Sequence, residues 1–184
     1  FLQMICHTLE IRPLLKVGVK DYNKLQESVL EIGDFLLEEE PLTYDPDHED
    51  FLNSIKTALM FNGFIKEEDE EFLFEQFNIR PGELRAKLEV AEWLLYTTEE
   101  LCKLMQYQSL VKHIIKLRLR LKYGVKEELL PLVRLENIGR ARARMLFRNN
   151  IKDIKDIKNA DLLMLSRIVG DKLEGFEGAK ITVL

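Results

Sequence analysis

The sequence predicts an all-α protein, a helical bundle followed by a small helix-hairpin-helix domain. Over the first two thirds of the chain, apolar residues recur three or four positions apart in long segments, which is the spacing of amphipathic helices. No two segments pair convincingly as strands. After Gly124 the pattern changes to short apolar segments separated by tight turns. We therefore expect a bundle over residues 1–124 and a hairpin domain over residues 125–184, with the boundary near Tyr123–Lys126.

The bundle should begin with three amphipathic helices. Residues 21–40 carry Leu25, Val29, Ile32 and Leu36 at helical spacing. A loop rich in acidic residues and containing two prolines follows over residues 41–50. Residues 51–65 again show helical spacing, and residues 67–78 predict a short acidic helix.

The longest predicted helix runs from Pro81, in the first-turn position that proline tolerates, to about Gln106. At 100° per residue, its core stripe is formed by Leu84, Leu88, Ala91, Leu95 and Cys102. Trp93, the one tryptophan of the chain, lies about 180° from Leu84. The Trp93 side chain either packs against a second surface of the protein or is exposed for binding a ligand. Helix periodicity does not decide between these two interpretations. If it is presented, an indole can stack on any base of a single strand.

Residues 116–122 alternate strictly between basic residues and leucine, which is a strand pattern. Leucine, arginine and lysine are nevertheless good helix formers, and no partner strand is visible. We therefore expect residues 111–123 to form a helix that ends at Gly124.

Beyond Gly124 we expect short helices over residues 127–135, 140–149 and 161–167, and a last one from Asp171. The turns between them fall at 136–139 and 169–170 and make two helical hairpins. The second hairpin has no basic cluster comparable to that of the first, although Arg167 and Lys172 flank its turn. It is expected to be the structural twin that completes the small domain.

Charge is distributed very unevenly. The net charge is −5, yet residues 1–111 hold 10 Lys and Arg against 23 Asp and Glu, whereas residues 112–158 hold 14 against 5. A basic block beside an acidic one is typical of polyanion binding, which the whole-chain charge conceals. A solvated charged face is the alternative.

The first hairpin has the pattern of a DNA-binding turn. Ile138 should fill the space between its helices, and Gly139 should let a phosphate approach the N-terminus of the next helix. Asn137 occupies a place where such hairpins usually have glycine, and it tolerates the unusual backbone angle. Side-chain phosphate contacts are expected from Arg140, Arg142, Arg144 and Arg148. Such contacts predict salt-sensitive binding without sequence preference. A hairpin used only for packing is the alternative. The segment from 134 to 148 contains five arginines and only one acidic residue, which favours DNA binding.

Other classes of site receive little support. The two cysteines are too few for a disulfide framework, and the three histidines have no partner at metal-ligand spacing. No run of eighteen apolar residues exists, so we expect no membrane span, and we expect the cytoplasm, in association with the nucleoid, as the location. The opening residues lack an initiator Met and are typical of the middle of a helix, which indicates a piece of a longer protein.

Two runs, Ile79–Tyr96 and Lys122–Arg144, resemble the C-terminal region of the archaeal Ski-like superfamily-two DNA-repair helicases, also called Holliday-junction-migration helicases. The resemblance implies two RecA-like motor domains and a winged helix ahead of a helical bundle. It also implies that the long helix is a ratchet along the 3′ strand and that Trp93 stacks on a base. A second ratchet contact of the family, an arginine, falls here on Ala86, and the neighbouring Arg85 and Lys87 point elsewhere. Arg85 and Lys122 complete our set of candidate DNA-binding residues.

The resemblance further implies that residues 129 to about 176 grip the emerging strand or brake the motor of a 3′–5′ helicase. The expected partners are single-stranded or forked DNA, the motor and winged-helix domains of the parent chain, and a sliding clamp or junction nuclease. This chain has neither a GxxxxGK[ST] phosphate loop nor a DExH box, so we expect no cofactor in it. ATP and Mg²⁺ are expected for the parent helicase, and no unwinding is expected from this part alone.

Two other functions stay open at this point. The acidic first part could be a regulatory or protein-interaction bundle that docks a basic partner. A hairpin-containing glycosylase or nuclease would need catalytic groups after the hairpin. Lys152, Asp153 and Asp156 stand there, but in a repeat typical of a solvated helix.

Overall fold

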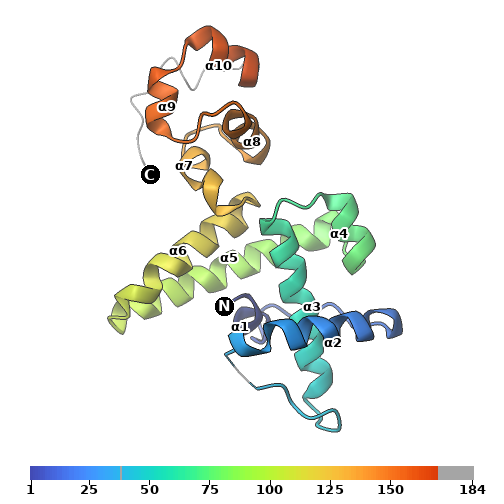
Figure 1. Ribbon diagram of the computed structural model, residues 1–184. Coiled ribbons are helices and arrows are strands. Elements are labelled where there is room, and N and C mark those ends of the chain that lie inside the picture. The colour runs from blue at the N-terminus through green and yellow to red at the C-terminus, as the bar shows by residue number, and fades with distance from the viewer. Residues whose placement is uncertain (38, 170–184) are drawn as a thin grey trace. The chain divides into compact units, whose positions relative to one another are not determined.

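The computed structural model describes residues 1–37 and 39–169, and every regular element within them is a helix (Figure 1). The predicted all-α fold class is therefore confirmed. The chain divides into two compact units, Phe1–Lys122 and Tyr123–Leu184, and each is described by itself. None of the described helices combines the length and the apolar character that a membrane span requires.

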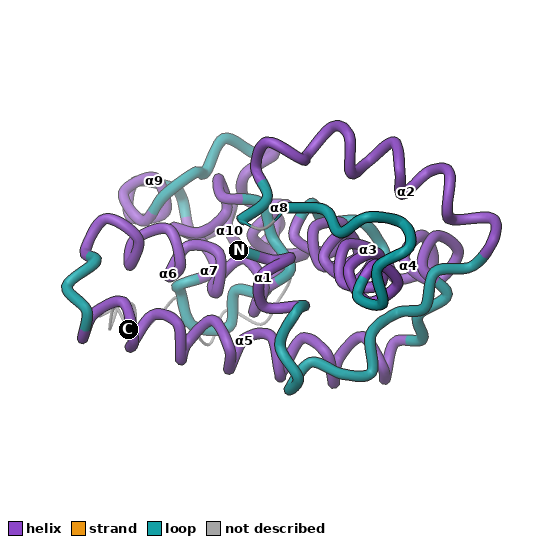
Figure 2. Tube along the Cα trace, turned by 90° about the horizontal axis from the view of Figure 1, so that it is seen from below, coloured by secondary structure: helices purple, strands orange, loops and turns teal. Residues whose placement is uncertain are grey.

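The first unit is built around α3 (His48–Ile65), most of whose 18 residues are buried. Helices α1 (Leu2–Cys6), α2 (Val19–Ile32) and α4 (Glu70–Phe77) pack against it. In Figure 2, α3 lies between α2 and α5. The N-terminal half of α3 contributes Phe51, Leu52 and Ile55 to a cluster with α2. Its C-terminal half contributes Ala58, Met60, Phe61 and Ile65 to the main core, which α1 and α4 to α6 also line.

The predicted helix over residues 21–40 is wrong at its C-terminal end. Helix α2 stops at Ile32, a 3₁₀ turn η1 covers Gly33–Phe35, and Leu36 is already extended. Glycine weakens a helix, and Pro41 favours extended backbone just before it, so the apolar residues beyond Gly33 do not continue the helix. At the next boundary, α3 begins at His48, three residues earlier than expected. Glu49 and Asp50 in its first turn favour this start through the helix dipole.

Helices α5 (Pro81–Leu104) and α6 (Gln108–Tyr123) run antiparallel and side by side (Figures 1 and 2). The start of α5 is stabilised by Glu83, whose Oε2 accepts a hydrogen bond from the Arg80 N–H at 3.2 Å. The predicted helix over the alternating basic run is confirmed. Ile114 and Leu121 are buried at helical spacing, and Leu117 packs against the same core.

Up to residue 169, the second unit contains η2 (Glu127–Leu129), α7 (Leu130–Val133), α8 (Arg140–Arg148), α9 (Ile154–Asn159) and α10 (Leu162–Val169). The single helix expected over residues 127–135 is wrong, because Pro131 lies within it and the segment forms a 3₁₀ turn followed by the short α7. Ile138 is 3% exposed, as predicted for the residue between the hairpin helices. The turn predicted at 169–170, Lys172 and the helix expected from Asp171 lie outside the described residues, except for Val169 at the end of α10.

Candidate nucleic-acid interface

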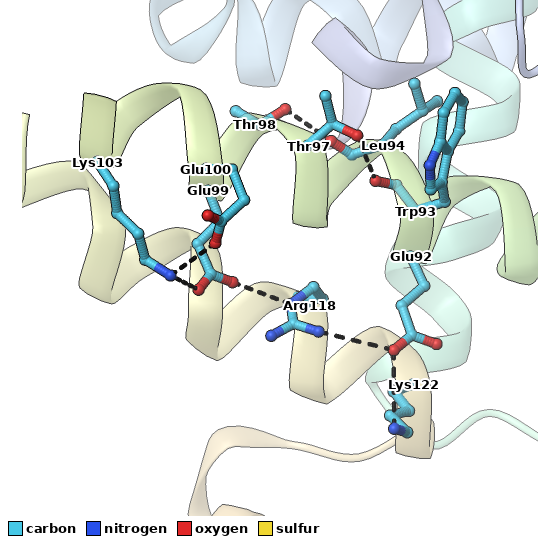
Figure 3. Close-up of polar contacts among 10 residues, drawn as sticks. All are labelled: Glu92, Trp93, Leu94, Thr97, Thr98, Glu99, Glu100, Lys103, Arg118 and Lys122. Carbon is cyan, nitrogen blue, oxygen red and sulfur yellow. Dashed lines mark hydrogen bonds and ion pairs between the residues drawn. The ribbon is translucent and has the colours of Figure 1, made fainter. Parts of the chain in front are cut away.

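Trp93 projects from the face of α5 that does not pack into the core. Leu84, Ala91 and Leu95 on the opposite face are buried, whereas Trp93 is 55% exposed. Periodicity left open whether the indole meets a second packing surface, and its exposure favours presentation to solvent. The Thr97 hydroxyl donates a hydrogen bond to the Trp93 carbonyl at 3.0 Å (Figure 3).

A chain of ion pairs joins α5 to α6 on the other flank of α5. The Arg118 guanidinium contacts Glu99 at 3.1 Å and Glu92 at 3.9 Å. Lys103 contacts Glu99 at 2.6 Å, and Lys122 contacts Glu92 at 3.8 Å. Only 5% of the Glu99 side chain is exposed, so this carboxylate depends on its two cationic partners to offset the loss of solvent. Arg118 also lies over the Tyr96 ring, 5.4 Å from its centre.

This network fixes which face of α5 is outermost. In Figure 3, Glu92 and Glu99 point toward α6, whereas the indole of Trp93 lies on the other side of α5. Sequence reasoning missed the network. The available signal was that Glu92 and Glu99 are seven residues apart and share a face, as do Arg118 and Lys122, four residues apart.

Arg85 and Lys87, the neighbours of Ala86, differ in their contacts and their exposure. Arg85 is 84% exposed and lies 3.5 Å from Glu89 on its own helix. Lys87 turns to the other side and donates hydrogen bonds to the carbonyls of Ile11 and Pro13. Burial lowers the pKa of Lys87, with Cys6 and Glu83 opposing that shift. Lys87 therefore ties α5 to the N-terminal loop and does not face the Trp93 side.

The hairpin turn of the second unit has the backbone that the sequence predicted for Asn137, with φ of 61°. Gly139 caps α8 in an extended conformation, φ −90° and ψ −177°, which any residue could adopt. A Cβ built on Gly139 would meet no atom within 4 Å. Neither backbone strain nor packing in the described structure therefore explains why this position is a glycine.

The N-terminus of α8 concentrates positive charge. The first turn contains no acidic residue and no side chain caps it, although helices usually place acids and capping oxygens there. Arg140 and Arg142 occupy that turn instead, beside the positive end of the helix dipole. The arrangement costs stability in the protein alone and favours an incoming anion.

The four arginines of α8 have different surroundings. Arg142 donates to the Asn137 carbonyl at 2.7 Å and so braces the hairpin turn. Arg144 is 19% exposed, contacts Glu128 at 3.0 Å and lies over the Phe147 ring. Arg148 is exposed and Arg140 is half-buried. Arg142 and Arg144, both expected as phosphate contacts, thus have structural partners within their own unit.

The nine predicted DNA-binding residues fall into two groups. Trp93, Arg85 and Lys122 belong to the first unit, and the other six lie around the hairpin of the second: Asn137, Gly139, Arg140, Arg142, Arg144 and Arg148. Sequence reasoning did not single out Glu128, the partner of Arg144, or the place of Lys152, whose amine lies 5.8 Å from the centre of the Phe147 ring. Within residues 1–37 and 39–169, no group of three or more His, Cys, Asp or Glu could hold a metal ion.

Comparison with known proteins adds an independent finding. The sequence model of archaeal helicase domain 4 matches residues 1–124. The chain is 36% identical over 170 residues to the ATP-dependent DNA helicase Hel308 of Pyrococcus horikoshii, covering 90% of this chain and 23% of that protein. It is 37% identical to Hel308 of Pyrococcus abyssi over 178 residues, or 95% of this chain and 24% of that protein. With Hel308 of Caldivirga maquilingensis it shares 38% identity over 141 residues, or 74% of this chain and 19% of that protein. The chain thus spans about a quarter or less of the relatives that it matches.

Proposed function

Because the chain belongs to the archaeal helicases, with residues 1–124 matching their domain 4, we propose that it binds single-stranded or branched DNA as an accessory part of an ATP-dependent 3′–5′ DNA-repair helicase. The relatives carry the name of ATP-dependent DNA helicases, and the proposal extends their substrate to this chain. The observation that carries it is the uncapped, acid-free first turn of α8, which begins at Gly139 and holds Arg140 and Arg142.

The hairpin supplies the ionic part of this binding. A phosphate oxygen at the α8 N-terminus would accept hydrogen bonds from backbone N–H groups and would lie at the positive end of the helix dipole. Gly139 gives the backbone room to approach it, since no side chain stands there. Arg140 and Arg148 extend the contact along α8, while Arg142 and Arg144 hold the hairpin in shape through Asn137 and Glu128. These contacts read no base, so binding is independent of sequence.

Trp93 supplies the non-ionic part. An exposed indole on a helix that is fixed to α6 by ion pairs, one of them through the buried Glu99, is a preorganised surface for a base. Stacking of one base on an aromatic side chain contributes about 1–3 kcal/mol and does not depend on base identity. Such a contact on a long rigid helix suits a ratchet, because each advancing base can occupy the same place.

The parent helicase supplies the rest of the activity under this proposal. ATP and Mg²⁺ act in its motor domains, since the 184 residues contain no phosphate loop that would fit them. The motor and winged-helix domains of the same polypeptide are the immediate partners, a sliding clamp or a junction nuclease is a further one, and the cytoplasmic nucleoid is the place of action.

The test is an anisotropy titration of a labelled single-stranded oligonucleotide at several salt concentrations. We compare the wild type with the double variant Arg140→Ala, Arg148→Ala. The expected result is weaker binding and a slope of log K against log [salt] that is shallower by about 0.7 for each phosphate contact removed. The matched control is Lys155→Ala, Lys158→Ala, which removes the same charge from exposed positions of α9. Equal slopes in the hairpin variant and the wild type would refute the hairpin as the DNA contact.

A second candidate function rests on a different surface. Residues 25–55 contain no lysine or arginine, and within them Leu30, Phe35 and Tyr44 are each at least 80% exposed. An acidic surface with exposed apolar side chains fits a protein partner with a basic, partly apolar face. A chain that binds no DNA in the titration above would favour this docking function.

A further inference from the structure

The face of α5 that presents Trp93 carries carboxylates and no cation. At 100° per residue, Glu89 and Glu100 lie within about 40° of Trp93 around the helix, and so do Ala86, Thr97 and Leu104. The side chains of Glu89 and Glu100 are 71% and 45% exposed. A strand that lays a base on the indole therefore passes two carboxylates, one about a turn before Trp93 and one about two turns after it.

The cations of α5 nearest to this face lie on its flank and are paired with carboxylates of the same helix. Arg85 and Lys103 lie about 80° from Trp93, on the flank that also carries Glu92 and Glu99. Arg85 contacts Glu89 at 3.5 Å, and Lys103 contacts Glu100 at 2.8 Å as well as Glu99.

The cations that α6 contributes at this flank are paired in the same way. Arg118 contacts Glu92 and Glu99, and Lys122 contacts Glu92. Arg85, Lys103, Arg118 and Lys122 thus each have a carboxylate partner. A phosphate would have to displace that partner before it could bind here.

We propose that the Trp93 contact is made to the base alone, because Glu89 and Glu100 pair with Arg85 and Lys103 and so leave this face without net positive charge to attract the phosphate backbone. The inference rests on the proposed function and specifies that the first unit recognises the base of a nucleotide and not its phosphate. Stacking releases no counterion, so its contribution to affinity is constant with salt, and the salt dependence belongs to the arginines of the second unit. The base contact then breaks at each step without the rupture of an ion pair.

The first arm of the test removes the backbone charge. A methylphosphonate oligothymidine, which keeps the bases and has an uncharged backbone, is titrated into the chain while the fluorescence of Trp93 is followed. Trp93 is the single tryptophan, so the signal reports this residue only. We expect quenching with an apparent affinity that is unchanged between about 50 and 200 mM salt. An abasic oligonucleotide with ordinary phosphates should bind without quenching.

The second arm removes the carboxylates. Glu89→Gln with Glu100→Gln should raise the affinity for ordinary single-stranded DNA at low salt by roughly twofold for each carboxylate and steepen its salt dependence. It should leave the affinity for the methylphosphonate oligomer unchanged. The control is Glu27→Gln with Glu31→Gln, which makes the same charge change at exposed positions of α2. We expect this control to match the wild type for both oligonucleotides.

Two failures can be told apart. If no oligonucleotide quenches Trp93 in the wild type, the proposed stacking itself is wrong. The base-only contact is overturned, while stacking stands, if the charged oligonucleotide quenches Trp93 and the methylphosphonate oligomer does not. The same conclusion follows if the Glu89→Gln, Glu100→Gln variant has the same DNA affinity as the α2 control variant.

Discussion

Glu99 on α5 accepts a hydrogen bond from Arg118 Nε on α6 at 3.1 Å, with only 5% of the Glu99 side chain exposed. The pair sets the rotation of α5 relative to α6. Because Trp93 lies on another face of the same helix, about 120° away from Glu99, the pair also holds the indole outward (Figure 3). A structural ion pair and a candidate binding residue are thus coupled through one rigid helix.

Removing the buried carboxylate should destabilise the first unit strongly. Glu99→Ala leaves Arg118 and Lys103 without their shared partner, and loss of one member of a buried pair costs about 3–5 kcal/mol. We expect the lower end, since Arg118 keeps Glu92 and is 23% exposed. Urea unfolding measures the change. Glu100→Ala is the matched control, since Glu100 also contacts Lys103 but is 45% exposed, and it should cost less than about 1 kcal/mol. Equal costs for the two variants would contradict this account.

Trp93 and Leu95 should separate binding from folding. Leu95 is fully buried, so Leu95→Ala should lower the free energy of unfolding by about 2–5 kcal/mol. Trp93→Ala should change that free energy far less and weaken single-stranded DNA binding by about 1–3 kcal/mol. Urea unfolding and DNA titration of both variants provide the check. A loss of stability in Trp93→Ala comparable to that in Leu95→Ala would make the indole a packing residue.

Gly139 offers a test of the hairpin that spares the fold. Serine caps a helix at least as well as glycine, and a Cβ at this position meets no atom within 4 Å. Gly139→Ser should therefore keep or raise stability, while its side chain occupies the space that a phosphate needs and lowers DNA affinity. Thermal unfolding and anisotropy measured on the same sample check both expectations. Undiminished DNA affinity would show that no phosphate approaches this turn.

Asp21 should make the stability of the first unit depend on acid pH. A hydrogen bond from Lys56 at 2.7 Å, with the Gly18 N–H and the charges of Lys56 and Lys24 assisting, lowers the pKa of Asp21 below its ordinary value of 3.8. The stabilisation is present above that value and is lost as pH falls through the lower pKa of the folded state. The difference in unfolding free energy between wild type and Asp21→Asn should therefore be constant near neutral pH and shrink below about pH 4. Urea unfolding at pH 7, 5 and 3 measures it, and a constant difference down to pH 3 would contradict the assignment.

Local patterns predicted the parts of the structure that depend on one segment at a time. Pro81 marked the start of α5. Of the predicted core stripe, Leu84, Ala91 and Leu95 are buried, and Leu88 and Cys102 are partly buried against the same core, but the buried Glu99 was missed. Ile138 and Asn137 have the burial and the backbone angle expected from the hairpin pattern. Each of these features depends on helix periodicity or on the conformational preference of a single residue.

The end of α2 was predicted wrongly although it is a local feature, because the apolar spacing continues past Gly33 while the helix does not. Features that depend on two segments were not predictable from periodicity. The partners of Glu99 and Arg144 depend on how α5 meets α6 and how α8 meets η2, which periodicity does not specify. Arg142 and Arg144 were predicted to contact phosphate because the hairpin is rich in arginine. The structure shows that Arg142 also binds the Asn137 carbonyl and that Arg144 also binds Glu128. The DNA-binding roles of all nine residues stay predictions.

The most direct measurement of the central claim is a titration of the chain with unlabelled single-stranded DNA at low salt, followed by Trp93 fluorescence and repeated with duplex. The account predicts strong quenching by the single strand, reversal on adding salt as the hairpin arginines release it, and weaker quenching by duplex. An anisotropy measurement that shows single-strand binding while Trp93 fluorescence stays constant would contradict the role of Trp93. The absence of binding in both measurements would contradict the proposed function.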